Sequence, residues 1–216
     1  MDSSSQNLEA LKDIKRIMER SSRFISLSGL SGIAVGICAL IGATFAWYRI
    51  NLYYKAYTAS DMCLSCLRED LLIIASVVFI AAFITATFFT FLKTQKEGVA
   101  IWGNSARRLL WNTMLPMLAG GFMLWRMIQL HQYQLIAPAS LIFYGLALVN
   151  GSKYTMGEVR FLGYAEILLG IINLWLYHEG LICWAIGFGI FHIIYGILMW
   201  WKYERGSKEV APEMMN

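Results

Sequence analysis

The fold of this chain is decided by one stretch, Arg160–Lys202, which reads RFLGYAEILLGIINLWLYHEGLICWAIGFGIFHIIYGILMWWK. It consists of two apolar segments separated by the short polar link His178-Glu179-Gly180. Each segment has enough residues to cross a bilayer as an α-helix, for which about 17–25 are needed. A link this short predicts a tight turn between two antiparallel helices that lie side by side.

Each of these two helices contains one ionisable residue well inside its apolar run, Glu166 in the first and His192 in the second. At about 1.5 Å per residue, both lie roughly 16–18 Å from the connecting turn, and therefore at nearly one depth. An ionisable group that faces lipid at such a depth costs about 2.5–3.5 kcal/mol or more. We therefore expect Glu166 and His192 to face the helix bundle and to form an intramembrane polar pair.

The composition extends this interpretation to the whole chain. Of 216 residues, 58% are hydrophobic and only 15% are charged, whereas soluble domains carry about a quarter charged residues. The apolar residues fall in long blocks and do not alternate, which favours helices over a β-barrel. The sequence thus predicts an all-α, polytopic integral membrane protein with six transmembrane helices, at Phe24–Tyr48, Leu71–Leu92, Leu109–Leu130, Leu135–Val149, Phe161–Tyr177 and Leu181–Trp201.

This division gives three parts: a cytoplasmic leader over 1–23, a transmembrane domain over 24–202 and a cytoplasmic tail over 203–216. Apolar residues recur in the leader at three- and four-residue spacing between charged ones, which is typical of an amphipathic helix. Such a helix lies on the inner leaflet of the membrane or pairs with a partner helix. The small residues Gly32 and Gly36 of the first span offer a separate alternative, pairing of two copies of the chain in a homo-oligomer.

The net charge of +4 does not indicate nucleic-acid binding, because the basic residues mark the loops and do not form a face. With the amino terminus inside, 14 of the 18 Lys and Arg residues fall on the cytoplasmic side, three fall on the opposite side, and Arg126 lies within a span. The excess of basic residues in the loops of one side predicts a multi-pass membrane protein with both termini in the cytoplasm. No cleavable signal peptide is expected, since the first apolar run is too long for one.

The outer side gathers potential metal ligands. Cys63 and Cys66 lie in the expected loop between Arg49 and Asp70, while the two other outer links contribute His131, His178 and Glu179. Two thiols and two imidazoles form a competent ligand set for zinc, and thiolates also suit copper. The alternatives are a local disulfide, a redox pair, or an ordinary belt of interfacial side chains.

Small residues and prolines suggest where helices pack closely or bend. Gly32 and Gly36 are four residues apart in the first span and predict close helix packing within the bundle. Pro116, followed by Gly120 and Gly121, predicts a kink in the third span. Pro138 falls in the first turn of the fourth span, where a proline breaks no hydrogen bond.

Three segments, LKDIKRIMERSSRFISLSGLSGI (11–33), LVNGSKYTMGEVRFLGYAEILLGI (148–171) and GFGIFHIIYGILMWWKYE (187–204), resemble a group of bacterial inner-membrane proteins of about this length, of the kind found in Bacteroidota. The resemblance covers most of the chain. It implies a six-helix membrane protein and implies no particular activity.

Three functions fit the sequence. The short loops, the amphipathic leader and the lack of a recognisable catalytic set favour a non-enzymatic sensor or accessory protein that acts with a partner. A small proton-linked transporter would use Glu166 and His192 as its proton site. A metal- or redox-handling membrane protein would use Cys63 and Cys66 with His131 and His178 on the outer face.

Overall fold

The computed structural model describes residues 28–56, 63–97 and 103–204. Within these ranges all regular structure is helical, so the expected all-α class is confirmed. The long helices are α2 (Gly29–Ala56), α3 (Leu64–Glu97), α4 (Asn104–Gln129), α5 (Ile136–Gly151) and α6 (Val159–Trp175). The last pass consists of α7 (Gly180–Trp184), the π-helix η5 (Ala185–Phe191), α8 (His192–Met199) and the π-helix η6 (Trp200–Glu204). Short 3₁₀ turns occur at η2 (Tyr133–Leu135), η3 (Ser152–Tyr154) and η4 (Tyr177–Glu179).

Four helical segments in the described ranges are long and apolar enough to cross a membrane: Gly29–Lys55, Leu64–Lys96, Tyr133–Tyr154 and Gly180–Tyr203. The two other expected spans correspond to α4 and α6. The α4 helix includes Arg107, Arg108 and Arg126, and α6 has only 17 residues. Four of the six expected spans thus correspond to helices that are long and apolar enough to cross a membrane.

The expected outer loop between Arg49 and Asp70 is shorter than the sequence suggested. Both helices continue into it, because α2 ends only at Ala56 and α3 already begins at Leu64. An ion pair between Arg49 and Asp70 joins the two extended ends. Cys66 therefore lies in the first turn of α3 and not in a loop. The expected leader over 1–23 lies outside the described residues.

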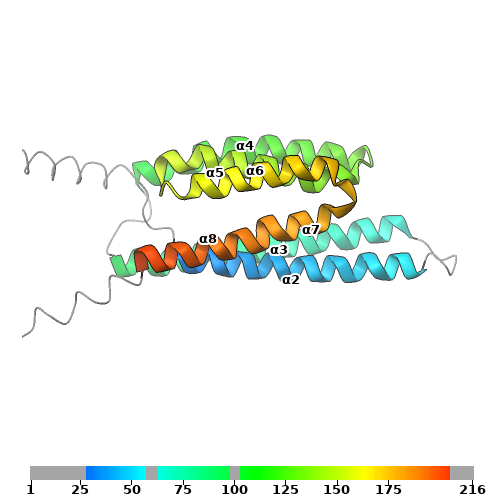
Figure 1. Cartoon of the computed structure of the whole chain (residues 1–216), viewed down its shortest axis with the longest axis horizontal. Coiled ribbons are helices and arrows are strands. Elements are labelled where there is room, and N and C mark those ends of the chain that lie inside the picture. Colours follow the sequence, from blue (N-terminus) through cyan, green and yellow to red (C-terminus); the bar gives the residue numbers. More distant parts are fainter. Residues whose placement is uncertain (1–27, 57–62, 98–102, 205–216) are drawn as a thin grey trace, which may run out of the picture.

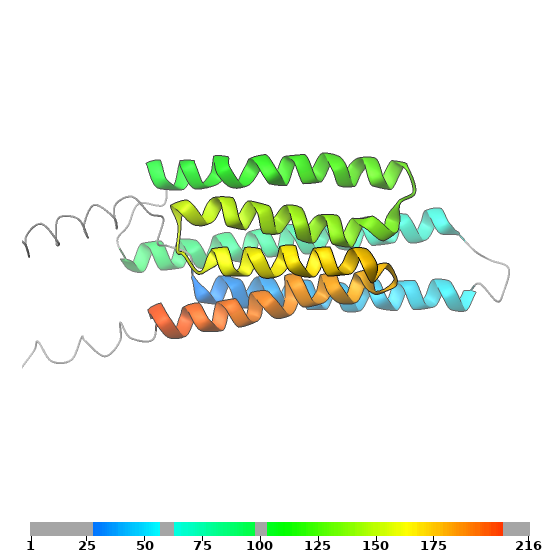
Figure 2. The same cartoon turned by 45° about the horizontal axis from the view of Figure 1, so that its top comes forward.

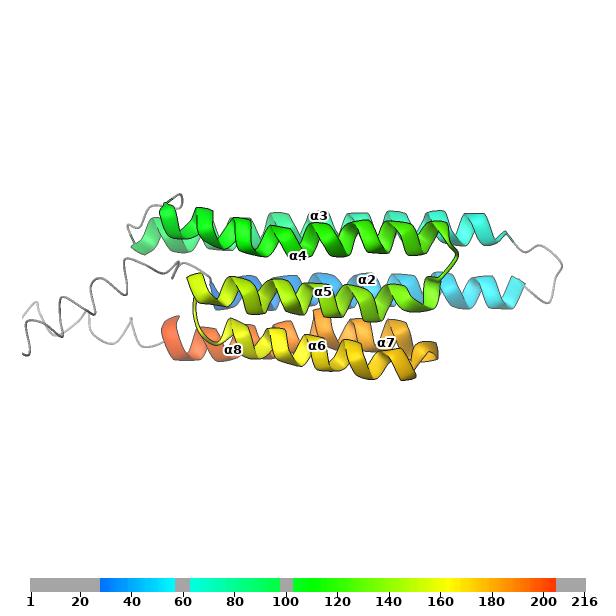
Figure 3. The ribbon, with the colours of Figure 1, turned by 90° about the horizontal axis from the view of Figure 1, so that it is seen from above.

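The helices form two layers of three (Figure 1). One layer contains α4, α5 and α6, with α5 in the middle; the other contains α3, α2 and the last pass, with α2 in the middle (Figures 2 and 3). We call the end of the bundle where α2, α4 and α6 begin the near end, and the opposite end the far end. The outer helices of each layer run antiparallel to its middle helix. The two middle helices, α2 and α5, run in opposite directions, so the two layers have opposite orientations.

Glycines let the helix backbones within each layer approach closely. A Cβ atom on Gly145 of α5 would lie 2.6 Å from the carbonyl oxygen of Gly163 on α6. A Cβ atom on Gly163 would in turn lie 2.8 Å from the carbonyl oxygen of Gly145. In the other layer, a Cβ on Gly36 would lie 2.6 Å from the carbonyl oxygen of Gly189, and one on Gly32 would meet the last pass at 3.1 Å. The predicted packing of Gly32 and Gly36 within the bundle is confirmed.

The α4 helix continues through Pro116, and the kink that the sequence predicts there stays a prediction. A proline has no N–H group, so it cannot donate to the carbonyl four residues earlier, that of Asn112. The side chain of Asn150 on α5 supplies the missing donor, with its Nδ2 2.7 Å from the Asn112 oxygen. Neighbouring helices commonly satisfy backbone groups that a proline frees in an apolar environment. Pro138 lies in the first turn of α5, as predicted.

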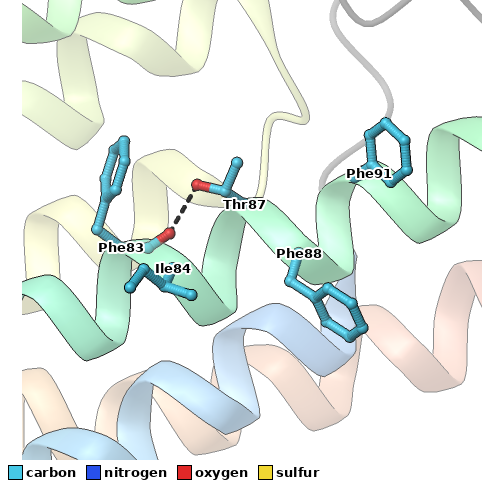
Figure 4. Close-up of a pocket in the computed structure, with 5 residues that line it drawn as sticks. All are labelled: Phe83, Ile84, Thr87, Phe88 and Phe91. Atoms are coloured by element: carbon cyan, nitrogen blue, oxygen red, sulfur yellow. Dashed lines mark hydrogen bonds between the residues drawn. The ribbon is translucent and has the colours of Figure 1, made fainter.

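The α3 helix has the highest hydropathy of the four candidate spans, yet none of its most apolar window is buried. Its exposed side carries a shallow apolar hollow lined by Phe83, Ile84, Thr87, Phe88 and Phe91 (Figure 4). The only polar side chain in this lining, that of Thr87, donates to the Phe83 carbonyl of its own helix at 2.6 Å. This surface suits contact with lipid chains and offers them no polar anchor.

Candidate functional site

The structure brings Glu166 and His192 together at the junction of the two layers. Glu166 is the eighth of the 17 residues of α6, and His192 is the first residue of α8, near the middle of the last pass. Glu166 is fully buried and His192 is 4% exposed. The distance between Glu166 Oε1 and His192 Nδ1 is 3.5 Å, within range of an ion pair. The expectation of one shared depth is met.

Two further contacts fix the imidazole of His192. Its Nδ1 lies 3.0 Å from the carbonyl oxygen of Gly187, and its Nε2 lies 2.7 Å from the hydroxyl of Tyr144 on α5. A carbonyl can only accept, so Nδ1 carries a proton and donates it to Gly187. A neutral imidazole then accepts from Tyr144 at Nε2, whereas a protonated one donates to the same hydroxyl. The Tyr144 contact can therefore serve either charge state of His192.

The carboxyl group of Glu166 is poorly satisfied. Among the described residues, no hydrogen-bond donor reaches either of its oxygens. It packs against Gly187, where a Cβ atom would come within 2.4 Å of Oε2. A buried charge without a partner is very costly, so an ionised Glu166 depends on the charge of the nearby imidazole. With one mobile proton shared between them, Glu166 and His192 are neutral in sum.

The π-helix η5 provides two of the contacts of the imidazole, those with Gly187 and Phe188. It spans Ala185–Phe191 and ends directly before His192. Short π segments within α-helices often mark functional sites, because they widen the helix and redirect side chains. Here the Nδ1 hydrogen bond returns over five residues to Gly187, and the ring of Phe188 stacks beside that of His192 with centroids 6.1 Å apart. Tyr144 packs on the same Phe188 ring at 4.9 Å.

Sequence reasoning missed three polar side chains of this region. Tyr144 lies in an apolar run, and the sequence gives no sign of which face of α5 meets the last pass. Asn173, two helical turns after Glu166, is fully buried, and its Oδ1 lacks a donor among the described residues. Tyr195, one turn after His192, has a buried hydroxyl without a partner in the same ranges. The sequence offered two signals: Asn173 lies seven residues after Glu166, and Tyr195 lies three residues after His192, so each shares a helix face with a member of the pair.

The expected outer-face ligands all lie at the far end, but they do not meet as a set. Cys63 and Cys66 form a disulfide with each other. His131, which has a φ of 58°, places Nδ1 2.9 Å from the Tyr133 hydroxyl. The short turn that follows it contacts the η4 turn, which holds His178 and Glu179.

Within the described ranges, no group of three or more His, Cys, Asp or Glu side chains is placed to hold a metal ion. The disulfide was one of the alternatives for Cys63 and Cys66. Zinc or copper binding by these thiols with His131 and His178 stays a prediction, and it would require reduction of the disulfide.

Over the part of the chain that the structure describes, the fold and the site define an all-helical protein with four helices able to cross a membrane and a buried carboxylate–imidazole pair between two helical layers. The chain has no significant match among protein-family models, curated proteins or solved structures.

Proposed function

We propose that the protein is a bacterial inner-membrane protein with six spans, and that its near end faces the cytoplasm. The distribution of basic residues supports this orientation. The 17 residues of α6 are at the lower limit for a span. In α4, Arg107 and Arg108 lie in the first turns and Arg126 in the last, where long basic side chains reach the membrane interfaces. Both helices therefore fit a bilayer despite their composition.

Within that membrane, we infer a small proton-linked transporter with Glu166 and His192 as its proton site. The observation that carries this inference is the burial of the pair at the junction of two layers with opposite orientations. In many transporters the coupling-ion site lies near the bilayer midplane, where two groups of helices meet. Ionisable residues inside a membrane are costly, and they commonly mark ion pathways.

Binding or loss of a proton changes the net charge of the Glu166–His192 pair, and this charge affects how closely the layers pack. Glu166 belongs to one layer and His192 to the other, so the pair crosses the junction. When the pair holds one mobile proton, it is neutral in sum and the layers can pack closely. When that proton leaves, a buried carboxylate remains beside a neutral imidazole, which favours separation of the layers and entry of water. Proton binding and layer packing are thereby coupled.

Infrared difference spectroscopy across a pH titration tests proton binding directly. In reconstituted protein, we expect the carbonyl band of a buried protonated carboxyl group to appear in the wild type and to be lost in Glu166→Gln. Glu158→Gln is the matched control, because Glu158 lies at the near end of the same helix and outside the pair. A titrating band that persists in Glu166→Gln would refute Glu166 as the proton site.

Transport is tested in proteoliposomes with an imposed pH gradient and a panel of small solutes. We expect uptake of at least one solute to depend on the gradient, to stop on addition of a protonophore, and to fail in Glu166→Gln. Gradient-dependent uptake at the wild-type rate in Glu166→Gln would contradict the proposal.

A second candidate is a proton-responsive sensor or accessory protein. One observation favours it: Glu166 is fully buried and His192 is only 4% exposed, so the pair is enclosed by protein. A closed site of this kind can take a proton without admitting a larger substrate. This candidate gives the same infrared titration, shows no solute uptake, and co-purifies with a protein partner.

A further inference from the structure

A groove runs along the outside of the bundle between α4 and α5. Its volume is about 440 Å³, and its walls are almost entirely apolar. The lining consists of Leu115, Pro116, Ala119, Phe143, Leu146 and Val149, with Asn150 and Lys153 at the near end. The amide of Asn150 is already committed to the Asn112 carbonyl, so Lys153 is the polar group that the groove presents.

The near end of the groove is strongly basic. Lys153 is exposed in the η3 turn, which packs on the beginning of α4. Arg108 is exposed on α4 and lies seven residues, about two turns, before Leu115 of the lining, and residues seven apart share one face of a helix. Arg107 adds a third exposed cation.

No acidic residue balances these cations within the elements that form the groove. The segments α4, α5 and η3 contain no Asp or Glu at any position. An apolar channel that ends in uncompensated positive charge at a membrane interface matches one chemistry, an acyl chain that carries an anionic headgroup. Basic pockets between helices on the cytoplasmic side are known sites for anionic lipid headgroups.

We propose that this groove binds an anionic phospholipid, with one acyl chain between α4 and α5 and the headgroup phosphate at Lys153 and Arg108. The hollow on α3 differs from this groove in charge, because its lining contains no cation for a headgroup (Figure 4). The α3 hollow can therefore accept any lipid chain, whereas the α4–α5 groove selects by charge. This site is separate from the Glu166–His192 pair and rests only on the proposed membrane embedding.

Lipid binding is measured by native mass spectrometry of delipidated, detergent-solubilised protein titrated with phosphatidylglycerol or with phosphatidylcholine that carries the same acyl chains. We expect the anionic lipid to bind the wild type more tightly. Near the membrane surface each basic residue contributes about 1 kcal/mol to anionic-lipid binding, so Lys153→Gln or Arg108→Gln should weaken phosphatidylglycerol binding roughly 5-fold. The double variant should weaken it roughly 30-fold.

Lys96→Gln is the matched control, because it removes the same charge from the near end of α3, a helix that does not line the groove. Ala119→Trp fills the apolar channel and should also weaken phosphatidylglycerol binding. Circular dichroism and size-exclusion chromatography verify that each variant is folded before its affinity is compared.

Three results would overturn the proposal. The first is equal affinity of the wild type for the two lipids. The second is a loss in Lys96→Gln as large as in the Lys153 and Arg108 variants. The third is displacement of the lipid by glycerol phosphate at the concentration where the lipid itself competes, since the site would then recognise phosphate alone.

Discussion

At the scale of single residues, the buried polar side chains of this protein differ in how well they are satisfied. The imidazole of His192 has a partner at each nitrogen, Gly187 and Tyr144. The hydroxyl of Tyr195, three residues later on the same helix, is buried without a partner among the described residues. A buried polar group that loses its partner costs about 1–3 kcal/mol, whereas the removal of one that already lacks a partner costs little.

Tyr144→Phe should therefore destabilise the protein by about 1–3 kcal/mol, because it leaves His192 Nε2 buried without a hydrogen bond. Tyr195→Phe also removes a buried hydroxyl group, but this hydroxyl has no hydrogen-bond partner among the described residues. The substitution should therefore be neutral or slightly stabilising. Both are measured by thermal unfolding in detergent. Equal effects of the two substitutions would show that the Tyr144–His192 hydrogen bond adds no stability.

Asn150 gives a second prediction at this scale. Asn150→Leu should cost about 1–3 kcal/mol, because the Asn112 carbonyl that Pro116 leaves free would lose the donor that now satisfies it. In a Pro116→Ala background, the backbone amide of the introduced alanine would donate to that carbonyl within α4, and Asn150→Leu should cost much less. A double-mutant cycle of unfolding free energies measures the difference. Additive effects would exclude this coupling.

At the scale of helices, glycine contacts determine how closely the elements of a layer pack. Gly196 on α8 faces α2 so closely that a Cβ atom would lie 2.6 Å from both the Gly29 carbonyl oxygen and the Ile33 nitrogen. Gly121 on α4 has the opposite environment, because a Cβ atom added there would have no neighbour within 4 Å among the described residues. Backbone atoms cannot move aside as a flexible side chain can, so the two glycines should respond differently to the same substitution.

Gly196→Ala should destabilise the protein by about 1–3 kcal/mol, the usual cost of overpacking. Gly121→Ala should be neutral or stabilising by up to about 1 kcal/mol, because alanine favours a helix more than glycine does. Thermal unfolding of both variants in the same detergent gives the comparison. A neutral Gly196→Ala would mean that α2 and α8 can separate without loss.

At the scale of the whole molecule, the two layers are joined at both ends of the bundle as well as at the Glu166–His192 pair. At the far end, the short η4 turn connects α6 directly to the last pass. At the near end, Glu158 before α6 accepts hydrogen bonds from Lys202 and from the Tyr203 hydroxyl, the latter at 2.7 Å. Burial opposes ionisation of Glu158, but these hydrogen bonds outweigh it and hold the pKa of its carboxyl below the ordinary value.

This contact should make stability depend on pH. Because the pKa of Glu158 is lower in the folded state, its contribution is complete above the ordinary pKa of about 4.3 and is lost as the pH falls through the folded value. Glu158→Gln should lower the melting temperature slightly at pH 7 and should have less effect at pH 3. Melting curves at both pH values measure this. A melting temperature difference that grows toward pH 3 would contradict the assignment.

Local sequence patterns were sufficient to predict several features of this protein. Blocks of apolar residues predicted the helices to within a few residues at most ends, because helix formation in an apolar setting depends on composition and length. The depth of Glu166 and His192 followed from the fixed rise of a helix. The small residues at Gly32 and Gly36 indicated close packing, although not which helix they would meet.

Contacts between distant parts of the chain were decided by the tertiary structure alone. Periodicity does not fix the rotation of one apolar helix against another when nearly all its faces are apolar, so Tyr144 and Asn173 were not recognised. The same ambiguity hid the hydrogen bond from Asn150 to the Asn112 carbonyl, which Pro116 leaves without a backbone donor. The sequence determined which segments are helices and how deep their ionisable residues lie. Only packing decided which side chains meet, because that depends on the rotation and pairing of helices far apart in the chain.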